Sequence, residues 1–199
     1  AIDKFQRSLT FWREAKNKVG EAGSFYLLSY TFNEISEYEK AHDAAKQALP
    51  LAQAAGEQRL EAWLHDQIGS SYNGLGESKK ALDSFLEAYR LRQSAKDPVG
   101  LGNTLNNLGY TYHAIGDLQK SLYYMGQVPP LMREVRDRLK ESTALGNLCV
   151  INTDMGHYQE ATKFCNEALN IKREINESAG EAITLSNFGN VYSHLGNYQ

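Results

Sequence analysis

The sequence predicts an all-α protein built from stacked helix pairs, because three features recur in phase along its 199 residues. A turn residue, glycine in all cases but one, returns every 40 residues: Ser36, Gly76, Gly116, Gly156 and Gly196. A small residue stands seven positions before each turn: Ser29, Gly69, Gly109, Cys149 and Gly189. A third residue, aromatic or asparagine, stands four positions before it. Self-similarity at a fixed period of this length indicates a repeat array, in which each repeat buries its apolar face against its neighbours.

Residues 102–141 illustrate the two helices expected in each repeat. Four residues at helical spacing form the inner face of the first helix: Leu105, Leu108, Gly109 and Tyr112. Gly116 ends this helix, and a second helix is predicted to begin near Leu118. Its inner face carries Ser121, Met125 and Val128. No stretch of the chain shows the sustained alternation typical of a β-strand.

The register of the repeats predicts how the chain is divided. Ala1 and Phe5 lie 40 residues before Ala41 and Ala45, so the chain opens inside the second helix of a repeat. We therefore expect residues 1–21 to form the second helix of a truncated repeat. Complete repeats are expected at 22–61, 62–101, 102–141 and 142–181, and the first helix of another truncated repeat at 182–199. The sequence is expected to be part of a longer array.

Two prolines stand at equivalent positions, 80 residues apart, late in a second helix: Pro50 and Pro130. A proline inside a helix removes a hydrogen bond and clashes with the preceding turn, so each position predicts a kink. The alternative is that the helix ends there and a new one begins, with proline in its first turn.

The residues of these helices resemble a known family. Leu105-Asn106-Asn107-Leu108-Gly109 with Tyr112, the turn glycine and the A-x-x-x-F-x-x-A pattern of residues 81–88 resemble the tetratricopeptide repeat. The 40-residue period resembles the subclass of kinesin light chains and LGN-like proteins. The resemblance implies a right-handed superhelical solenoid of antiparallel helix pairs, and a non-catalytic protein-interaction scaffold that binds an extended peptide or a partner helix in its concave groove.

Composition and spacing argue against several other classes of protein. The net charge of −3 disfavours a nucleic-acid surface, and no apolar run is long enough to span a bilayer. Cys149 and Cys165 occupy the small packing position and the facing position of the second helix, so they are expected to lie close together. Without a pairing pattern they predict buried free thiols and a cytoplasmic location; a disulfide, which requires an oxidising compartment, is the alternative. The histidines have no metal-ligand spacing and no nucleophile stands on a distinctive motif, so no enzyme activity, metal or cofactor is predicted.

A second stripe on each first helix supplies the candidate binding residues. It contains one carboxamide per repeat, at Gln67, Asn107, Asn147 and Asn187. A carboxamide both donates and accepts hydrogen bonds, so this ladder can bind the main chain of an extended peptide. Further candidates on or beside the stripe are Trp63, Asn103, Tyr110, His113 and Asn190. The alternative is that the carboxamides bond to a neighbouring repeat and have only a structural role.

Two other functions remain open at this point. The repeats are alternatively a sensor array of a larger protein, whose effector domain, such as a protease or a nucleotide-binding switch, lies outside the sequence. A self-assembling array is the third hypothesis, with apolar residues of the two ends stacking head to tail. Those residues are Phe5, Leu9 and Phe11 at one end and Leu185, Phe188 and Tyr192 at the other.

Overall fold

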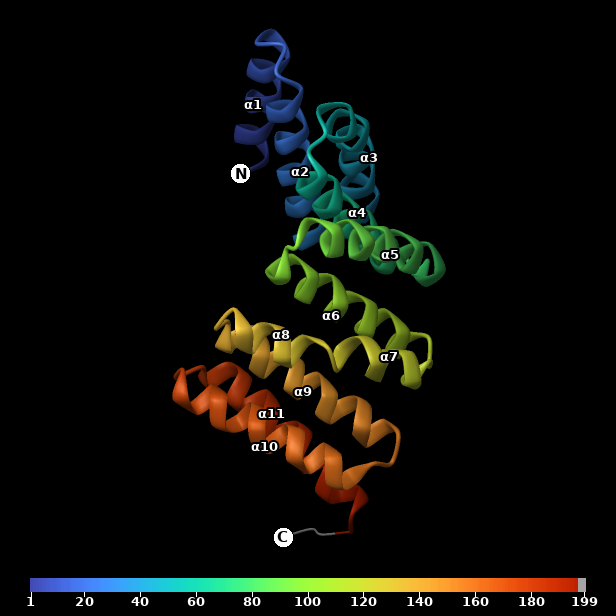
Figure 1. Ribbon diagram of the computed structural model, residues 1–199, viewed down its shortest axis with the longest axis vertical. Coiled ribbons are helices and arrows are strands. Elements are labelled where there is room, and N and C mark those ends of the chain that lie inside the picture. Colours follow the sequence, from blue (N-terminus) through green and yellow to red (C-terminus); the bar gives the residue numbers. More distant parts are fainter. Residues whose placement is uncertain (197–199) are drawn as a thin grey trace. The chain divides into compact units, whose positions relative to one another are not determined.

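The computed structural model describes residues 1–196, which form eleven α-helices joined by short turns and contain no strand (Figure 1). Two compact units divide the chain, residues 1–104 and residues 105 onward. The first unit contains α1 (Ile2–Glu14), α2 (Lys18–Glu34), α3 (Tyr38–Ala55), α4 (Gln58–Gly74), α5 (Ser78–Ala95) and the start of α6 (Pro98–Ala114). The second contains the rest of α6, α7 (Leu118–Met125), α8 (Val128–Glu134), α9 (Arg138–Asp154), α10 (Tyr158–Glu174) and α11 (Ser178–His194). The predicted all-α architecture of helix pairs is confirmed.

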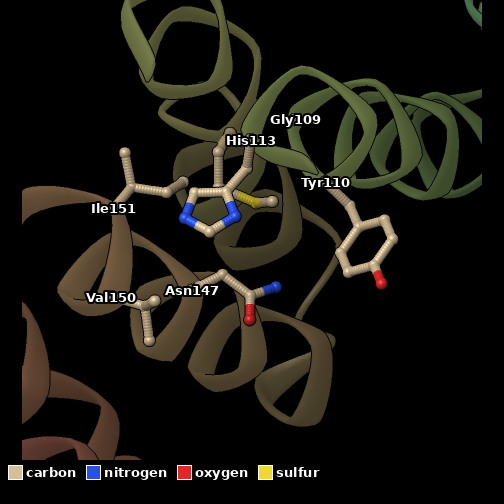
Figure 2. Close-up of a pocket in the computed structure, with 7 residues that line it drawn as sticks. Gly109, Tyr110, His113, Asn147, Val150 and Ile151 are labelled. Atoms are coloured by element: carbon tan, nitrogen blue, oxygen red, sulfur yellow. The ribbon is translucent and has the colours of Figure 1, made fainter. Parts of the chain in front are cut away.

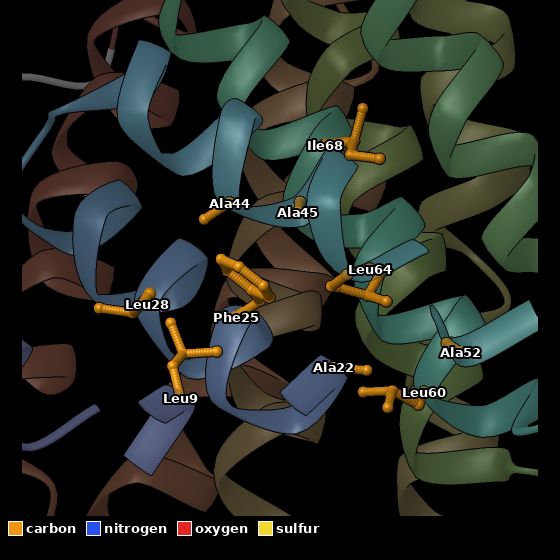
Figure 3. Packing of buried hydrophobic residues seen from close by; sticks show 11 residues of the cluster. Leu9, Ala22, Phe25, Leu28, Ala44, Ala45, Ala52, Leu60, Leu64 and Ile68 are labelled. Carbon is orange, nitrogen blue, oxygen red and sulfur yellow. The ribbon is translucent and has the colours of Figure 1, made fainter. Parts of the chain in front are cut away.

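The core of the first unit is formed by apolar residues of α1 to α4 (Figure 3). Phe25 lies at the centre of this cluster, between Leu9 and the alanines of α3. Small residues allow the helices to approach closely, and the pair Gly69 and Phe85 shows why. A Cβ atom at residue 69 would lie 2.6 Å from the Phe85 ring, so this position requires glycine.

The second unit uses the same pair of positions in two ways. Gly109 faces Met125, whose Cε lies 2.9 Å from where a Cβ of residue 109 would stand. In the next repeat Cys149 and Cys165 occupy these positions and form a buried disulfide, with their Cα atoms 5.3 Å apart. The prediction of free thiols is therefore wrong. The repeat register placed the two cysteines at facing positions of α9 and α10, and the disulfide that was the alternative to free thiols forms there.

The turns fall into two series, each with a period of 40 residues. The predicted series has positive φ at every member, including Ser36. A second series joins the end of each repeat to the next and also has positive φ: Lys16, Gly56, Lys96, Arg136 and Asn176. Only one member of this second series is glycine, so residue type alone does not mark these turns.

The two predicted proline sites differ. Pro50 lies inside the continuous helix α3. Pro130 lies in the first turn of α8, a new helix that begins two residues before it, after the break that ends α7 at Met125. The interpretation of a helix that ends and restarts therefore holds for Pro130, whereas at Pro50 the helix continues. No helix within residues 1–196 is long and apolar enough to cross a membrane.

Candidate partner-binding surface

The predicted stripe of the second unit is bordered by three hollows. We define the inner stripe as the residues that continue the carboxamide ladder along α6, α9 and α11: Asn107, Tyr110, Ala114, Thr143, Asn147, Val150, Asp154, Ile183, Asn187, Asn190 and His194. Each of the three hollows takes at least three of its lining residues from this stripe.

The first hollow, here called the Tyr110 hollow, lies between α6 and α9 and has a volume of about 160 Å³ (Figure 2). Its walls are almost wholly apolar and include Met125, Val150 and Ile151. Tyr110 stands at its border with 63% of its surface exposed. The hollow therefore has the character of a site for an apolar side chain.

His113 also lines the Tyr110 hollow, and its Nε2 lies 2.6 Å from the Asp154 carboxylate on α9. Both side chains are partly exposed. This contact joins the first helices of two neighbouring repeats, so His113 is held in place at the edge of the hollow rather than pointing freely into solvent.

Two further hollows lie between α9 and α11. The Lys172 hollow, of about 440 Å³, is lined by Thr143, Gly146 and Asn147 of α9, by Thr184 and Asn187 of α11, and by Lys172. The His194 hollow, of about 110 Å³, is mainly polar and is lined by Asp154, Asn187, Asn190 and His194. The predicted residues Asn187 and Asn190 therefore lie together.

The carboxamides of the ladder stand at the borders of these hollows. Asn147 lines both the Tyr110 and the Lys172 hollows, and Asn187 lines both the Lys172 and the His194 hollows. Asn147 also donates a hydrogen bond from Nδ2 to Oδ1 of Asn106, at 3.1 Å. Asn107 is half-buried on α6. The three carboxamides of this unit, Asn107, Asn147 and Asn187, are thus all half-buried. Among the described residues, only Asn147 of these three forms a hydrogen bond to another helix, α6.

The predicted residues of the first unit have a different environment. Gln67 accepts a hydrogen bond at 2.9 Å from Nδ2 of Asn33, on the preceding first helix. Trp63 is 40% exposed and stacks on Tyr26, with ring centroids 5.5 Å apart. Asn103 is exposed. Gln67 therefore bonds to a neighbouring first helix, as the structural interpretation of the ladder expects, whereas Trp63 presents an aromatic surface.

A buried ionic cluster lies beneath the first helices of the first unit. Arg92 pairs with Asp66 at 2.5 Å and with Asp97 at 2.9 Å, and the Asp66 carboxylate also accepts a hydrogen bond from Thr104 at 3.0 Å. Burial raises the pKa of Asp66 to about 6, against the opposing effect of the Arg92 charge. The Arg92 Nε atom has no hydrogen-bond partner among the described residues.

The comparison with known families identifies the chain. A tetratricopeptide repeat family model matches residues 58–134 and 140–199, which is more than half of the sequence. The chain belongs to the tetratricopeptide repeat family. This match confirms the resemblance inferred from the sequence. Tetratricopeptide repeats are protein-interaction repeats. No curated protein matches the chain.

Solved tetratricopeptide-like structures share the fold at low sequence identity. BtubC (BKLC) from P. vanneervenii aligns with a TM-score of 0.86 and 18% identity, over 100% of this chain and 84% of its own. The repeats of a putative kinesin light chain from Podosopora anserina align with a TM-score of 0.75 and 14% identity, over 88% of this chain and 87% of that chain. A signal transduction ATPase with a tetratricopeptide repeat sensor from Pyrococcus horikoshii aligns with a TM-score of 0.78 and 16% identity, over 92% of this chain and 29% of that protein.

Some residues of this tetratricopeptide surface were not predicted. Lys172 is on the second helix α10, and the predicted stripe consists of first-helix residues, so the stripe pattern does not include it. Leu27 and Tyr30 are 40% and 47% exposed, and lie at the stripe positions of α2. Leu27 and Tyr30 lie 40 residues before Gln67 and Ser70 of the predicted stripe. The repeat period therefore predicts their position, although their repeat is divergent.

Proposed function

We propose that the inner stripe of the second unit binds an extended peptide segment of a partner protein. The observation that carries this proposal is the position of Asn147 and Asn187, each at the border of two neighbouring hollows. An extended peptide presents main-chain N–H and C=O groups between successive side chains. Carboxamides between hollows match this alternation, since each can bond to the main chain while the hollows receive side chains.

The hollows also favour particular side chains. The Tyr110 hollow is apolar and fits an aliphatic side chain, and Tyr110 itself belongs to a residue type enriched where interfaces derive most of their affinity. The His194 hollow is polar and fits a hydrogen-bonding side chain. We therefore expect the peptide to alternate in chemistry along the stripe.

Substitution of the carboxamides tests the proposal. Peptides selected from a phage-displayed random library against the folded chain provide the probe, with affinity measured by isothermal titration calorimetry. We expect Asn107→Ala, Asn147→Ala and Asn187→Ala together to weaken binding at least about tenfold, because each removes hydrogen bonds to the main chain. The matched control is Asn166→Ala with Asn170→Ala, exposed carboxamides on α10. Equal loss in the control, or no loss in a folded triple variant, contradicts the proposal.

The Asn147–Asn106 hydrogen bond supports the structural alternative at one position of the ladder. The two roles separate by measurement. If Asn147 only holds α6 and α9 together, Asn147→Ala lowers the unfolding midpoint and leaves peptide affinity unchanged. If it binds the ligand main chain, affinity falls by more than the change in stability accounts for.

A second candidate function is sensing within a larger protein. Its support is the similarity to the Pyrococcus horikoshii protein, in which a tetratricopeptide sensor is joined to a signal transduction ATPase and this chain corresponds to 29% of the length. The sequence of the full-length gene tests it: a downstream or upstream nucleotide-binding or protease domain is expected, and a gene encoding only repeats contradicts it.

Self-association remains a third proposal, with a smaller set of residues than the sequence predicted. Leu9 and Phe188 are buried in their own units and are not available for stacking. Phe5 is half-buried and packs against the core of the first unit, whereas Phe11, Leu185 and Tyr192 are 58%, 47% and 41% exposed. Light scattering over a concentration range should show growing mass if these faces stack, and a constant monomer mass would exclude it.

The remaining predictions on partners and location rest on sequence features. Net charge is the basis for expecting no nucleic-acid partner, and short apolar runs for expecting no membrane partner. The cytoplasmic location was predicted from unpaired cysteines, and the Cys149–Cys165 disulfide removes that support.

A further inference from the structure

The Lys172 hollow and the buried ionic cluster of the first unit are built from equivalent positions, 80 residues apart. Arg92 corresponds to Lys172, and both cations are buried. Asp97 corresponds to Glu177. Asp97 forms an ion pair with Arg92 at 2.9 Å, and Glu177 forms one with Lys172 at 3.1 Å. In these two repeats, therefore, a cation from the end of the second helix meets the start of the next first helix.

Two further positions preserve this arrangement. A Cβ atom at Gly100 would lie 1.4 Å from the Arg92 guanidinium, and one at Gly180 would lie 2.4 Å from the Lys172 ammonium. Thr104 and Thr184 are both buried. The Thr184 hydroxyl donates to the Gly180 carbonyl, whereas the Thr104 hydroxyl lies within hydrogen-bond distance of both the Asp66 carboxylate and the Gly100 carbonyl. The two sites therefore share the cation, its acidic partner, the glycine beneath the cation and the hydroxyl.

The cation and its acidic partner keep their charge in both sites, but the carboxylate of Asp66 in the first unit has no counterpart in the second, which has Gly146 at that position. The Asp66 carboxylate bonds to Arg92 and Thr104. At Gly146 there is no side chain, and a Cβ atom placed there would have no neighbour within 4 Å. The place that a carboxylate fills in the first unit is thus part of a hollow of about 440 Å³ in the second.

We propose that the Lys172 hollow is a binding site for a carboxylate, which takes the place of the absent Asp66 equivalent. It accepts hydrogen bonds from Lys172 and from Thr184, whose hydroxyl turns to it from the Gly180 carbonyl. Resting on the proposed function, we assign the carboxylate to an Asp or Glu side chain of the peptide on the inner stripe. Thr143, Asn147, Ile183 and Asn187 of that stripe line the same hollow, so the site opens where the peptide lies.

The hydrogen-bonding capacity of Lys172 supports this assignment. An ammonium group has three donors, and here Glu177 at 3.1 Å and Thr143 at 3.5 Å are its acceptors among the described residues. Arg92, by comparison, bonds to two carboxylates. A ligand carboxylate would supply the second anionic acceptor, and charge-assisted hydrogen bonds of this kind are roughly twice as strong as neutral ones.

The first experiment uses propionate as a probe of the site without any peptide. In a ¹H–¹⁵N NMR titration, we expect propionate to shift the amide signals of Gly146, Gly180 and Thr184. Gly146→Asp should abolish these shifts, because its own carboxylate fills the site. Thr184→Val should weaken binding at least about threefold. Thr162→Val is the matched control, since its hydroxyl bonds within α10 away from the hollow. Absence of shifts in the wild-type protein, or undiminished shifts in folded Gly146→Asp and Thr184→Val, overturns the proposal.

The second experiment identifies the source of the carboxylate. A library-selected peptide that binds the inner stripe is synthesised with Glu or Gln at each position in turn. The proposal predicts one position where Glu binds at least about tenfold more tightly than Gln, and where Lys172→Met removes the difference. Propionate binding without such a position supports a carboxylate site for free small acids and overturns the peptide assignment. Peptide binding without any effect of propionate or Glu leaves the proposed function intact and overturns this inference.

Discussion

The Oδ2 atom of Asp66 lies 2.5 Å from the Nη2 atom of Arg92, and their side chains are only 8% and 3% exposed. The pair joins a first helix to the second helix of the same repeat, α4 to α5. Removing one partner leaves the other as a buried charge without compensation, which commonly costs about 3–5 kcal/mol.

We therefore predict that Arg92→Met lowers the free energy of unfolding of the first unit by about 3–5 kcal/mol. Methionine is chosen because Met132 occupies the equivalent buried position 40 residues on. Urea unfolding followed by tryptophan fluorescence measures the effect, since both tryptophans, Trp12 and Trp63, lie in this unit. Adding Asp66→Leu to Arg92→Met should recover part of the loss. A loss no larger than that of the exposed control Arg90→Met would contradict the prediction.

The raised pKa of Asp66 predicts a pH dependence of stability. Burial raises this pKa from 3.8 to about 6, so between these values the folded state binds more protons than the unfolded state. The contribution of this group is fully present below about pH 4 and is lost as the pH rises through about 6. The loss is up to about 3 kcal/mol, at 1.36 kcal/mol for each unit of pKa.

This dependence is measured as a difference between two proteins. Asp66→Asn mimics the protonated acid at every pH, whereas the other titrating groups are common to both chains. Urea unfolding at pH 4 and pH 7.5 should show that the wild type loses stability relative to Asp66→Asn as the pH rises. A constant difference across this range would show that Asp66 does not titrate there in the folded protein.

The sequence predicted those parts of the fold that depend on a repeated pattern of residue type. Gly69, Gly109 and Cys149 were identified as the small packing position from their spacing alone, and each lies against the second helix of its repeat. Tyr110, Asn147 and Asn187 were placed on one stripe for the same reason, and each lines a hollow. Period and phase are enough for these features, because every repeat places the same position in the same environment.

Contacts that depend on one particular pair of residues were not predictable in this way. The His113–Asp154 contact and the Asp66–Arg92 pair each require two particular side chains, and the adjacent repeats do not have the same two residue types at these positions. The emptiness at Gly146 is visible only when it is compared with Asp66, two repeats earlier. Knowledge of the helix packing is needed before such pairs can be recognised.

The second series of turns leads to a prediction on stability. Arg136 has φ of 59°, a left-handed conformation that costs a non-glycine residue roughly 1–2 kcal/mol. Glycine removes this cost but makes the unfolded chain more flexible, which offsets part of the gain. We expect Arg136→Gly to raise the free energy of unfolding by about 0.5–1 kcal/mol. Arg136→Ala removes the same side chain and keeps the backbone cost, so it should not stabilise. Equal effects of the two changes in urea unfolding would assign the effect to the side chain instead.

The disulfide between Cys149 and Cys165 gives the last prediction, because it replaces a packing solution that the neighbouring repeat achieves without a covalent bond. Both pairs join equivalent positions, and the Gly109–Met125 pair fills the space by combining no side chain with a long one. The disulfide closes a loop of 16 residues, and restricting the unfolded chain in this way is worth about 3 kcal/mol.

Reduction with a phosphine should therefore lower the free energy of unfolding of the wild-type second unit by about that amount. Equilibrium urea unfolding monitored by circular dichroism measures this change. Cys149→Gly with Cys165→Met copies the neighbouring pair and should be insensitive to the reductant. Thiol titration of the denatured, unreduced wild-type protein is expected to find no free thiol, and two free thiols would show that the bond does not form in the isolated protein.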